Sequence, residues 1–291
     1  MTKLHYHLLD VFTDQKFGGN QLAVFLDGHE VPENLMQTIA RELNLSETVF
    51  VLPPEDKANH FKLRIFTPAQ EVPIAGHPTV GTTYLLFHEN KIQVGNSRLE
   101  EGVGVIPVHI DENGVVKMTQ PLPQFGPVYD DRNAIAEMLS INESGLHPDY
   151  PVEFVSAGVP FMYIVVKDLA TLQQVRLRQD TWEKVLRDKH VFVFTTETVQ
   201  PTSTVHARMF APALGIPEDP ATGAACGPLG GYLVKYGIVK TENARKIICE
   251  QGFEMGRPSL IQIEVEVEKG NISGVRIGGK SVYVGAGVIH L

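Results

Sequence analysis

Hydrophobic and polar residues follow one another in short runs along most of this chain, and such runs predict strands rather than helices. In the first half, the expected strands are 4–13, 22–26, 48–52, 61–67, 103–110 and 115–119. Two helices are expected between them, one over 32–43 and one from a Gly-His-Pro-Thr turn to about residue 90. Short connections between strands favour an antiparallel or mixed sheet over a doubly wound parallel sheet.

The second half has a similar pattern. Helices are expected over 131–139, 181–188 and 222–236, and strands near 154, 162, 191 and 205 and over 259–268 and 275–284. The segments 80–87 and 227–234 are apolar on every side of a helix, which predicts burial all round. A sheet wrapped around one central helix in each half satisfies both patterns.

The chain contains an internal repeat. Four blocks of the first half recur in the same order and with nearly constant spacing: Gly19–Val24 with Gly158–Tyr163, Glu47–Val51 with Lys189–Val193, Arg64–Ala69 with Arg208–Ala213, and His77–Gly81 with Asp219–Gly223. Repeats of this length indicate similar folding units of ordinary domain size. We therefore expect two lobes, 1–120 and 121–278, with the last strand, 279–291, completing the first.

The second helix of each expected lobe begins with a polar residue, His77 in one and Asp219 in the other. Helix N-termini carry free N–H groups and partial positive charge, so they attract anions such as carboxylates. Two lobes facing each other could bring both helix starts to one anionic substrate, with Gly76 and Gly223 allowing close approach of the backbone. The alternative is that His77 and Asp219 only cap their helices.

Glu47 is a third candidate because it begins the strand in LSETVFVL, directly before Val49, Phe50 and Val51. A carboxyl group against an apolar wall can have its pKa raised and can then carry a proton in both directions. The alternatives are an exposed glutamate at a strand edge or an acid paired with Arg41.

Composition narrows the classes of partner. The 291 residues include 43% hydrophobic residues and carry a formal net charge of −9, so nucleic acid and anionic membranes are not expected as partners. No secretory signal and no membrane-length apolar run is visible, so we expect a cytoplasmic protein whose two cysteines, Cys226 and Cys249, are reduced. His5-x-His7 lacks further ligands, and no metal site is expected.

Four blocks resemble one known family. GGNQLAVF (18–25), LNLSETVF (43–50), AGHPTVG (75–81) and EDPATGAACG (218–227) are similar to the signature blocks of the phenazine-biosynthesis PhzF-like isomerases. That resemblance implies an α+β fold like that of diaminopimelate epimerase, with two pseudo-symmetric lobes, each a mostly antiparallel or mixed sheet around a central helix. It also implies a homodimer that needs no cofactor.

The resemblance implies roles for particular residues. The catalytic positions of the family match Glu47, His77 and Asp219, and its substrate-binding positions match Asn20, Gly76, Gly223 and Ala224. Two positions depart from the family pattern, since Ala224 replaces the usual serine and Gln21 replaces the usual proline. Ala224 therefore lacks the hydroxyl group that a serine would offer to a ligand.

These features lead to an expected activity. We expect an isomerase that moves a proton between carbons of a small carboxylate-bearing substrate, such as a cyclic one similar to dihydro-hydroxyanthranilate, with Glu47 as the general acid and base. One alternative is a two-base epimerase or racemase, which would need a cysteine in each lobe at the positions of His77 and Asp219; neither Cys226 nor Cys249 lies there. The other is a non-catalytic protein that binds small anions, which Ala224 permits.

Overall fold

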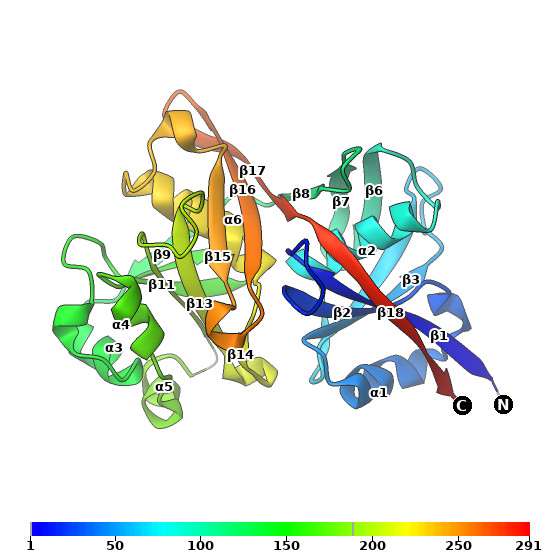
Figure 1. Cartoon of the computed structure of the whole chain (residues 1–291), viewed down its shortest axis with the longest axis horizontal. Coiled ribbons are helices and arrows are strands. Elements are labelled where there is room, and N and C mark those ends of the chain that lie inside the picture. Colours follow the sequence, from blue (N-terminus) through cyan, green and yellow to red (C-terminus); the bar gives the residue numbers. More distant parts are fainter. Residues whose placement is uncertain (1, 188) are drawn as a thin grey trace. The chain divides into compact units, whose positions relative to one another are not determined.

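The computed structural model describes residues 2–187 and 189–291, and the chain divides into two compact units. Unit 1 comprises Met1–Thr119 and Arg276–Leu291, and unit 2 comprises Gln120–Val275. In Figure 1, unit 1 runs from blue to blue-green and ends in the red C-terminal strand, whereas unit 2 runs from green to orange. The last strand of the chain therefore belongs to the same unit as the first.

Unit 1 is a mixed sheet. Its strands are β1 (Lys3–Val11), β2 (Asn20–Phe25), β3 (Glu47–Leu52), β4 (Phe61–Phe66), β5 (Glu71–Val72), β6 (Gly95–Glu101), β7 (Gly104–Ile110), β8 (Val116–Gln120) and β18 (Ser281–His290). β18 pairs with β1, and β1 pairs with β2, in antiparallel fashion. The pairs β2–β3 and β4–β6 are parallel, while β3–β4, β6–β7 and β7–β8 are antiparallel.

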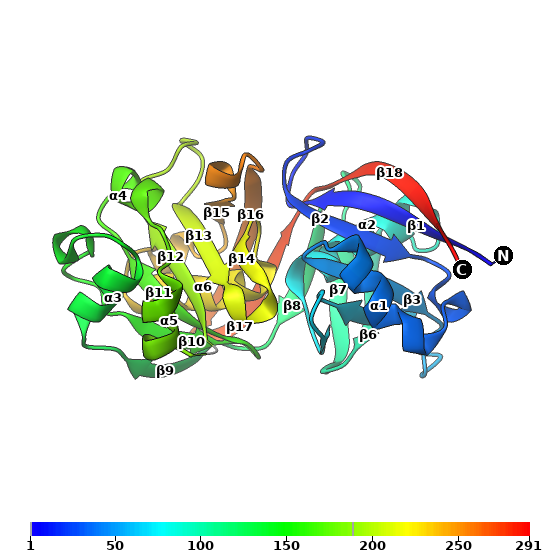
Figure 2. The same ribbon diagram turned by 90° about the horizontal axis from the view of Figure 1, so that it is seen from below.

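A buried helix lies inside this sheet. α2 (Gly76–His88) packs against β1, β2, β3, β7 and β18, and most of its residues are buried (Figure 2). Gly81 shows how tightly the helix is held, because a Cβ atom there would lie 2.6 Å from the Val11 side chain. The expected central helix is therefore confirmed.

A second helix covers the other face of the same sheet. α1 (Glu33–Leu43) is preceded by the 3₁₀ turn η1 (Gly28–Glu30) and ends at Asn44, which adopts a left-handed conformation. Its apolar side packs against sheet residues in one core cluster, whose buried members are Leu4, Phe25, Val31, Met36, Ile39, Ala40, Phe50 and Phe66. Unit 1 thus has helices on both faces of its sheet.

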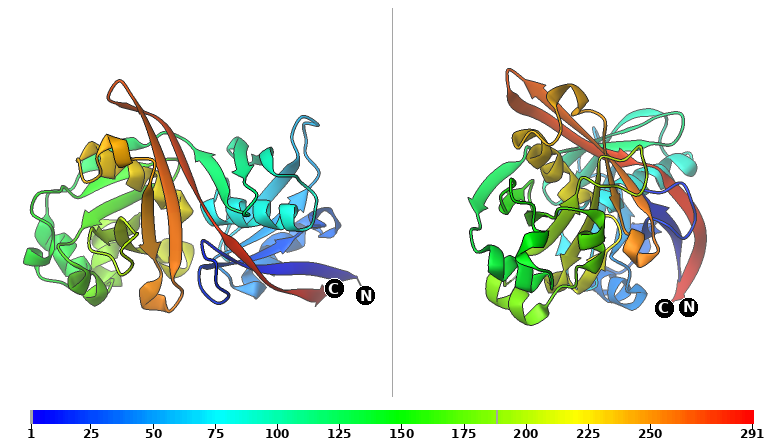
Figure 3. Two further views of the ribbon diagram at one scale, coloured as in Figure 1. Left: turned by 45° about the horizontal axis from the view of Figure 1, so that its top comes forward. Right: turned by 60° about the vertical axis from the view of Figure 1, so that its left-hand side comes forward.

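Unit 2 contains the remaining elements. Its strands are β9 (Gln124–Val128), β10 (Glu153–Ser156), β11 (Pro160–Val165), β12 (His190–Thr195), β13 (Val205–Ala211), β14 (Ile216–Asp219), β15 (Ile247–Gln251), β16 (Ser259–Glu268) and β17 (Asn271–Gly279), whose last residues enter unit 1. Its helices are α3 (Arg132–Met138), α4 (Leu169–Gln174), α5 (Gln179–Val185) and α6 (Gly223–Lys235), with 3₁₀ turns η2 (Glu143–Gly145), η3 (Pro212–Leu214), η4 (Thr241–Asn243) and η5 (Phe253–Met255). The helix expected over 181–188 begins earlier, and its last residue, Asp188, lies outside the described residues. β16 and β17 are joined by a tight turn at Lys269 and Gly270 (Figure 3).

The two units share one topology. In unit 2, β11–β12 and β13–β15 are parallel, while β10–β11, β12–β13 and β15–β16 are antiparallel. This is the same order of pairings as from β1 to β7 in unit 1, and the buried helix α6 takes the place of α2. The pseudo-symmetric, mixed-sheet fold is confirmed.

The structure corrects the alignment of the two central helices. α2 and α6 each have 13 residues, so Gly76 corresponds to Gly223 and His77 to Ala224. The helix ends agree with this pairing, because Asn90 and Gly237 both have positive φ angles two residues beyond. The sequence alignment, which paired His77 with Asp219, is wrong in this block.

A smaller correction applies to β3. Leu22 of β2 pairs with Glu47, and the matching residue of β11, Phe161, pairs with His190. The residue of unit 2 that corresponds to Glu47 is therefore His190 and not Lys189. One residue matters here because adjacent residues of a strand point to opposite faces.

Five strands were not expected from the sequence, namely β5, β6, β9, β14 and β15. In β6 and β15, buried positions carry polar side chains, among them Ser97, Glu101, Glu250 and Gln251. Apolar alternation is the signal for a half-buried strand, and these residues remove it. β6 and β15 were therefore missed because they bring polar groups into the interior.

One buried ion cluster should make the stability of unit 2 depend on pH. His206 Nδ1 lies 2.7 Å from Glu250 Oε2, and its Nε2 lies 3.1 Å from Glu254 Oε1. Burial alone would lower the pKa of His206, but hydrogen bonds to Glu254 and Glu250 outweigh it and raise that pKa. Burial would raise the pKa of Glu254, but the hydrogen bond from His206 outweighs it and lowers that pKa.

The His206→Gln variant should lose about 3 kcal/mol of unfolding free energy, because Glu250 and Glu254 then lack their cation. The His206 contribution is complete below its unfolded pKa and is lost as pH rises through the raised folded pKa. The Glu254 contribution is present above its unfolded pKa and is lost as pH falls through the lowered folded pKa. The difference in unfolding free energy between His206→Gln and wild type should therefore be largest between the lowered folded pKa of Glu254 and the raised folded pKa of His206. Urea denaturation across pH measures it. His109→Gln, at an exposed histidine, is the control; an equal loss in both variants would contradict the assignment.

Candidate functional site

Three of the candidate residues lie together in unit 1. Asn20 is the first residue of β2, Glu47 is the first residue of β3, and His77 is the second residue of α2. Because β2 and β3 are parallel, their first residues lie at the same edge of the sheet. His77 Nε2 lies 3.4 Å from Glu47 Oε2, and His77 Nδ1 lies 3.3 Å from Asn20 Nδ2.

The surroundings of these residues are largely dry. The exposed fraction of the side chain is 4% for His77 and 15% for Glu47. Burial lowers the pKa of His77 to about 3, although a main-chain hydrogen bond with Gln21 opposes the shift. The His77 ring is therefore neutral at physiological pH.

A neutral imidazole suits a carboxyl group that exchanges protons. The ring has one N–H donor and one acceptor nitrogen, so it can contact either a carboxylate or a carboxylic acid. Asn20 also has a donor and an acceptor in its side-chain amide and can pair with either tautomer of His77. A charged imidazolium would instead hold Glu47 in its ionised form.

The structure excludes helix capping by His77 and pairing of Glu47 with Arg41. α2 begins at Gly76 with Ala75 as its N-cap and no side-chain cap, so His77 does not cap the helix and Pro78 is its third residue. Arg41 donates from Nε to the Pro68 carbonyl at 3.3 Å, whereas Glu47 faces His77. The N-cap side chain therefore accepts none of the amides in the first turn of α2.

The other candidates lie in unit 2. Asp219 is the last residue of β14 and is 5% exposed, and Gly223 and Ala224 are the first two residues of α6. The N-cap of α6 is Thr222, without a side-chain cap. Thr222 Oγ1 donates to Asp219 Oδ2 at 2.6 Å, so Asp219 precedes the helix and does not cap it.

Gln251 holds this segment in place, and sequence reasoning missed it. Its side chain is fully buried and donates from Nε2 to the Asp219 carbonyl at 2.7 Å and to Thr222 Oγ1 at 2.9 Å. Its Oε1 accepts from the Thr222 amide at 3.0 Å. A polar residue at the end of the otherwise apolar segment Ile247–Cys249 was the available signal.

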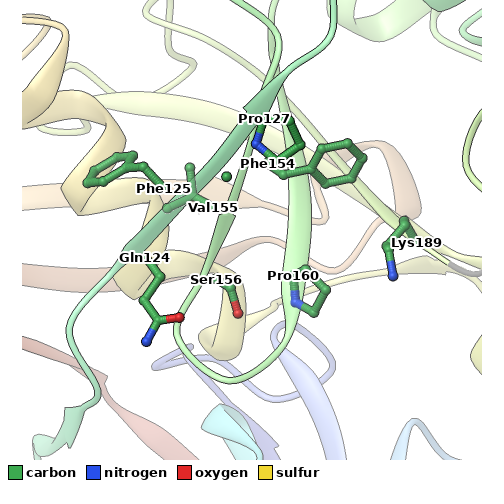
Figure 4. Close-up of a pocket in the computed structure, with 9 residues that line it drawn as sticks. Gln124, Phe125, Pro127, Phe154, Val155, Ser156, Pro160 and Lys189 are labelled. Carbon is green, nitrogen blue, oxygen red and sulfur yellow. The ribbon is translucent and has the colours of Figure 1, made fainter.

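One hollow of unit 2 contains none of the candidate residues. It has a volume of about 380 Å³ beside β9, β10 and β11 (Figure 4). Its lining side chains are mainly apolar, with one lysine: Gln124, Phe125, Pro127, Phe154, Val155, Ser156, Pro160 and Lys189. We assign no catalytic role to it.

Comparison with known proteins identifies the family of this chain. Residues 9–287 match the family described as phenazine biosynthesis-like protein. An uncharacterized isomerase of Mesorhizobium japonicum is 37% identical, with 100% of each chain covered. The trans-2,3-dihydro-3-hydroxyanthranilate isomerase of Pseudomonas chlororaphis is 34% identical, with 99% of each chain covered.

Solved structures agree. The PhzF-family phenazine biosynthesis protein of Bacillus anthracis has a TM-score of 0.90 at 27% identity, with 100% of each chain covered. A hydroxyproline epimerase of Agrobacterium vitis shares the fold, with a TM-score of 0.65 at 12% identity, covering 99% of this chain and 91% of its own.

This chain belongs to the phenazine biosynthesis-like (PhzF) family and is an isomerase. Among the described residues, no helix has the length and apolar character needed to cross a membrane.

Replacing Gln251 with methionine should impair both stability and turnover. Methionine preserves the volume but leaves the Asp219 carbonyl and the Thr222 amide without their partner. The unfolding free energy should fall by about 1–3 kcal/mol. Turnover by the folded fraction should also fall, because Asp219 is no longer fixed. Gln262→Met, on the neighbouring strand β16, is the matched control. Unchanged turnover in a folded Gln251→Met protein would show that the position of Asp219 is unimportant.

Proposed function

We propose that this isomerase moves a proton between two carbons of a small carboxylate-bearing substrate, such as a cyclic acid similar to dihydro-hydroxyanthranilate. Glu47 is the general acid and base. His77 and Asp219 act with it in catalysis, while Asn20, Gly76, Gly223 and Ala224 bind the substrate. The 34% identity to an isomerase named for that reaction supports the substrate class.

The contact between Glu47 and a buried, neutral His77 carries the proposal. Glu47 retains enough exposure to meet a ligand, and His77 approaches it without an ion pair that would lock it as a carboxylate. The carboxylate removes a proton from one carbon, and conjugation in the substrate spreads the remaining electron pair. The same carboxylic acid then returns the proton to another carbon. The proton count is balanced, and no oxidant or reductant is required.

The helix starts supply the attraction for an anion. In unit 1, the first turn of α2 presents amides beside the neutral His77. In unit 2, α6 begins at Gly223 without a side-chain cap, and Asp219 lies just before it. Partial positive charge at a helix N-terminus favours a carboxylate by about 0.3–1 kcal/mol at an exposed site and by more when the site is buried.

A two-base epimerase or racemase has no specific support from the side chains. Cys226 and Cys249 are both fully buried. The residue of α6 that corresponds to His77 is Ala224, which cannot carry a proton.

We further propose that the enzyme works as a homodimer and without a cofactor. Light scattering and assays after dialysis against a chelator test these two points.

Glu47→Gln should keep the fold and lower turnover by about 10²–10⁴-fold, because the amide cannot accept the proton. The assay is NMR in deuterated water with trans-2,3-dihydro-3-hydroxyanthranilate, followed by a panel of small cyclic acids and amino acids. Deuterium should enter the product only with wild type and with Glu42→Gln, a control at an exposed glutamate of α1. Wild-type turnover by Glu47→Gln would eliminate this residue as the base. Tight binding without exchange for every compound would favour the anion-binding alternative.

His77 should remain neutral throughout the working pH range. With its pKa near 3, its ring ¹⁵N shifts should stay those of a neutral imidazole between about pH 5 and pH 9. Heteronuclear NMR of ¹⁵N-histidine-labelled protein measures this directly, and His77→Phe identifies the signal. A His77 titration between pH 6 and pH 7 would show that Glu47 faces an imidazolium instead.

A further inference from the structure

A second buried carboxyl group lies beneath the same helix start. Glu101 is the last residue of β6, and its side chain points into unit 1, where it is 7% exposed. Its Oε1 lies 2.5 Å from Oγ1 of Thr79, two residues after His77 on α2. The same Thr79 Oγ1 lies 2.6 Å from the carbonyl oxygen of Ala75, the N-cap of α2.

Counting hydrogens shows which form of Glu101 fits this arrangement. The Thr79 hydroxyl has a single hydrogen, so it can donate to the Ala75 carbonyl or to Glu101, but not to both. Whichever of these two short contacts does not receive the Thr79 hydrogen needs a hydrogen from Ala75 or from Glu101. A carbonyl has none, whereas a carboxylic acid does. Both contacts are hydrogen bonds at once only when protonated Glu101 donates to Thr79 and Thr79 donates to Ala75.

The environment agrees with a neutral acid. Burial raises the pKa of Glu101 to about 8, although hydrogen bonds with Thr79 and the Ala75 main chain act in the opposite direction. Glu101 also lines a hollow of about 490 Å³, whose charged members are Glu55, Asp56, Lys62, Arg64, Glu71 and Glu100.

The charged groups around that hollow have partners other than Glu101. Arg64 binds Glu71 and Glu33, and Lys62 binds Glu55. Glu100 accepts hydrogen bonds from the Glu55 and Asp56 amides and from Asn59. On α2, His77 is neutral. Within residues 2–187 and 189–291, Glu101 Oε2 is buried without a hydrogen-bond partner.

We propose that Glu101 is a positioning residue of the active site: as a neutral acid it donates to Thr79, which donates to Ala75, and this chain of hydrogen bonds fixes the first turn of α2 and with it His77. Its effect on turnover rests on the function proposed above. The hydrogen-bond chain itself does not.

Ionisation of Glu101 removes the hydrogen that this chain needs. Thr79 then has one hydrogen for two acceptors, so the N-cap of α2 is held less firmly. The new negative charge also lies near the helix start and reduces its attraction for an anionic substrate. Both effects reduce kcat/KM above the pKa of Glu101, the first through kcat and the second through KM.

Stability measurements test the protonation state without any assay of activity. Because the folded pKa of Glu101 is raised, folded wild type becomes less stable relative to unfolded protein as pH rises from about 4.5 to about 8. Glu101→Gln keeps a donor for Thr79 but cannot ionise. Its Tm relative to wild type should therefore increase across this interval and level off above it. Glu100→Gln, on the neighbouring and already ionised residue, should show no such trend.

The pH profile of kcat/KM tests the effect on the site. Wild type and Glu100→Gln should lose activity by about tenfold per pH unit above pH 8, and the loss should level off once Glu101 is fully ionised. Glu101→Gln should keep the neutral-pH activity and lack this alkaline limb. Glu101→Leu, which has no donor, should be about tenfold to 100-fold less active at every pH.

The outcomes separate this inference from the proposed function. A Tm difference between Glu101→Gln and wild type that does not change with pH would overturn the neutral acid. An alkaline limb that persists in Glu101→Gln would overturn the positioning role. Should no substrate turn over, the ring signals of His77 give the second readout. They should shift near pH 8 in wild type but not in Glu101→Gln, and the absence of that shift would overturn the proposal.

Discussion

The rest of the structure depends on the cost of burying a helix on every side. Most residues at the start of α2 and α6 are buried, and an unpaired buried polar group destabilises a fold by about 1–3 kcal/mol. Each sheet must therefore bring polar side chains to the point where its helix begins. β6 brings Glu101 in unit 1, and β15 brings Gln251 in unit 2. The position of the polar clusters follows from the architecture before any chemistry is considered.

The two units meet this requirement in different ways. In unit 2, the amide of Gln251 binds the chain just before α6 and thereby fixes Asp219. In unit 1, His77 has a lowered pKa and Glu101 a raised one, and burial is the main cause of both shifts. Two titratable groups near one helix start are thus both neutral. Neither neutralises the partial positive charge of α2, which remains available to an anion.

Sequence patterns were informative where they depend on apolar residues. The buried helices, the mixed sheet and the repeated order of elements all follow from hydrophobic periodicity and from the matched blocks around Arg64 and Arg208. The contact of Glu47 with His77 does not, because the register of β2 against β3 is a long-range property. Glu101 and Gln251 were missed because an inward polar residue removes the alternation that identifies a strand. The pairing of His77 with Asp219 failed because two proline-containing turns look alike in sequence although only one of them lies within its helix.

The corrected alignment bears on the reaction itself. Two-base racemisation needs a proton carrier on each side of the substrate, and a repeated fold could supply one at each helix start. Here the repeat places His77 opposite Ala224 in the alignment, and Glu47 opposite His190. Ala224 cannot exchange a proton, and both cysteines are buried. The two units share one fold but carry different side chains at these corresponding positions. This difference favours chemistry by a single carboxyl group that takes a proton from one carbon and returns it to another.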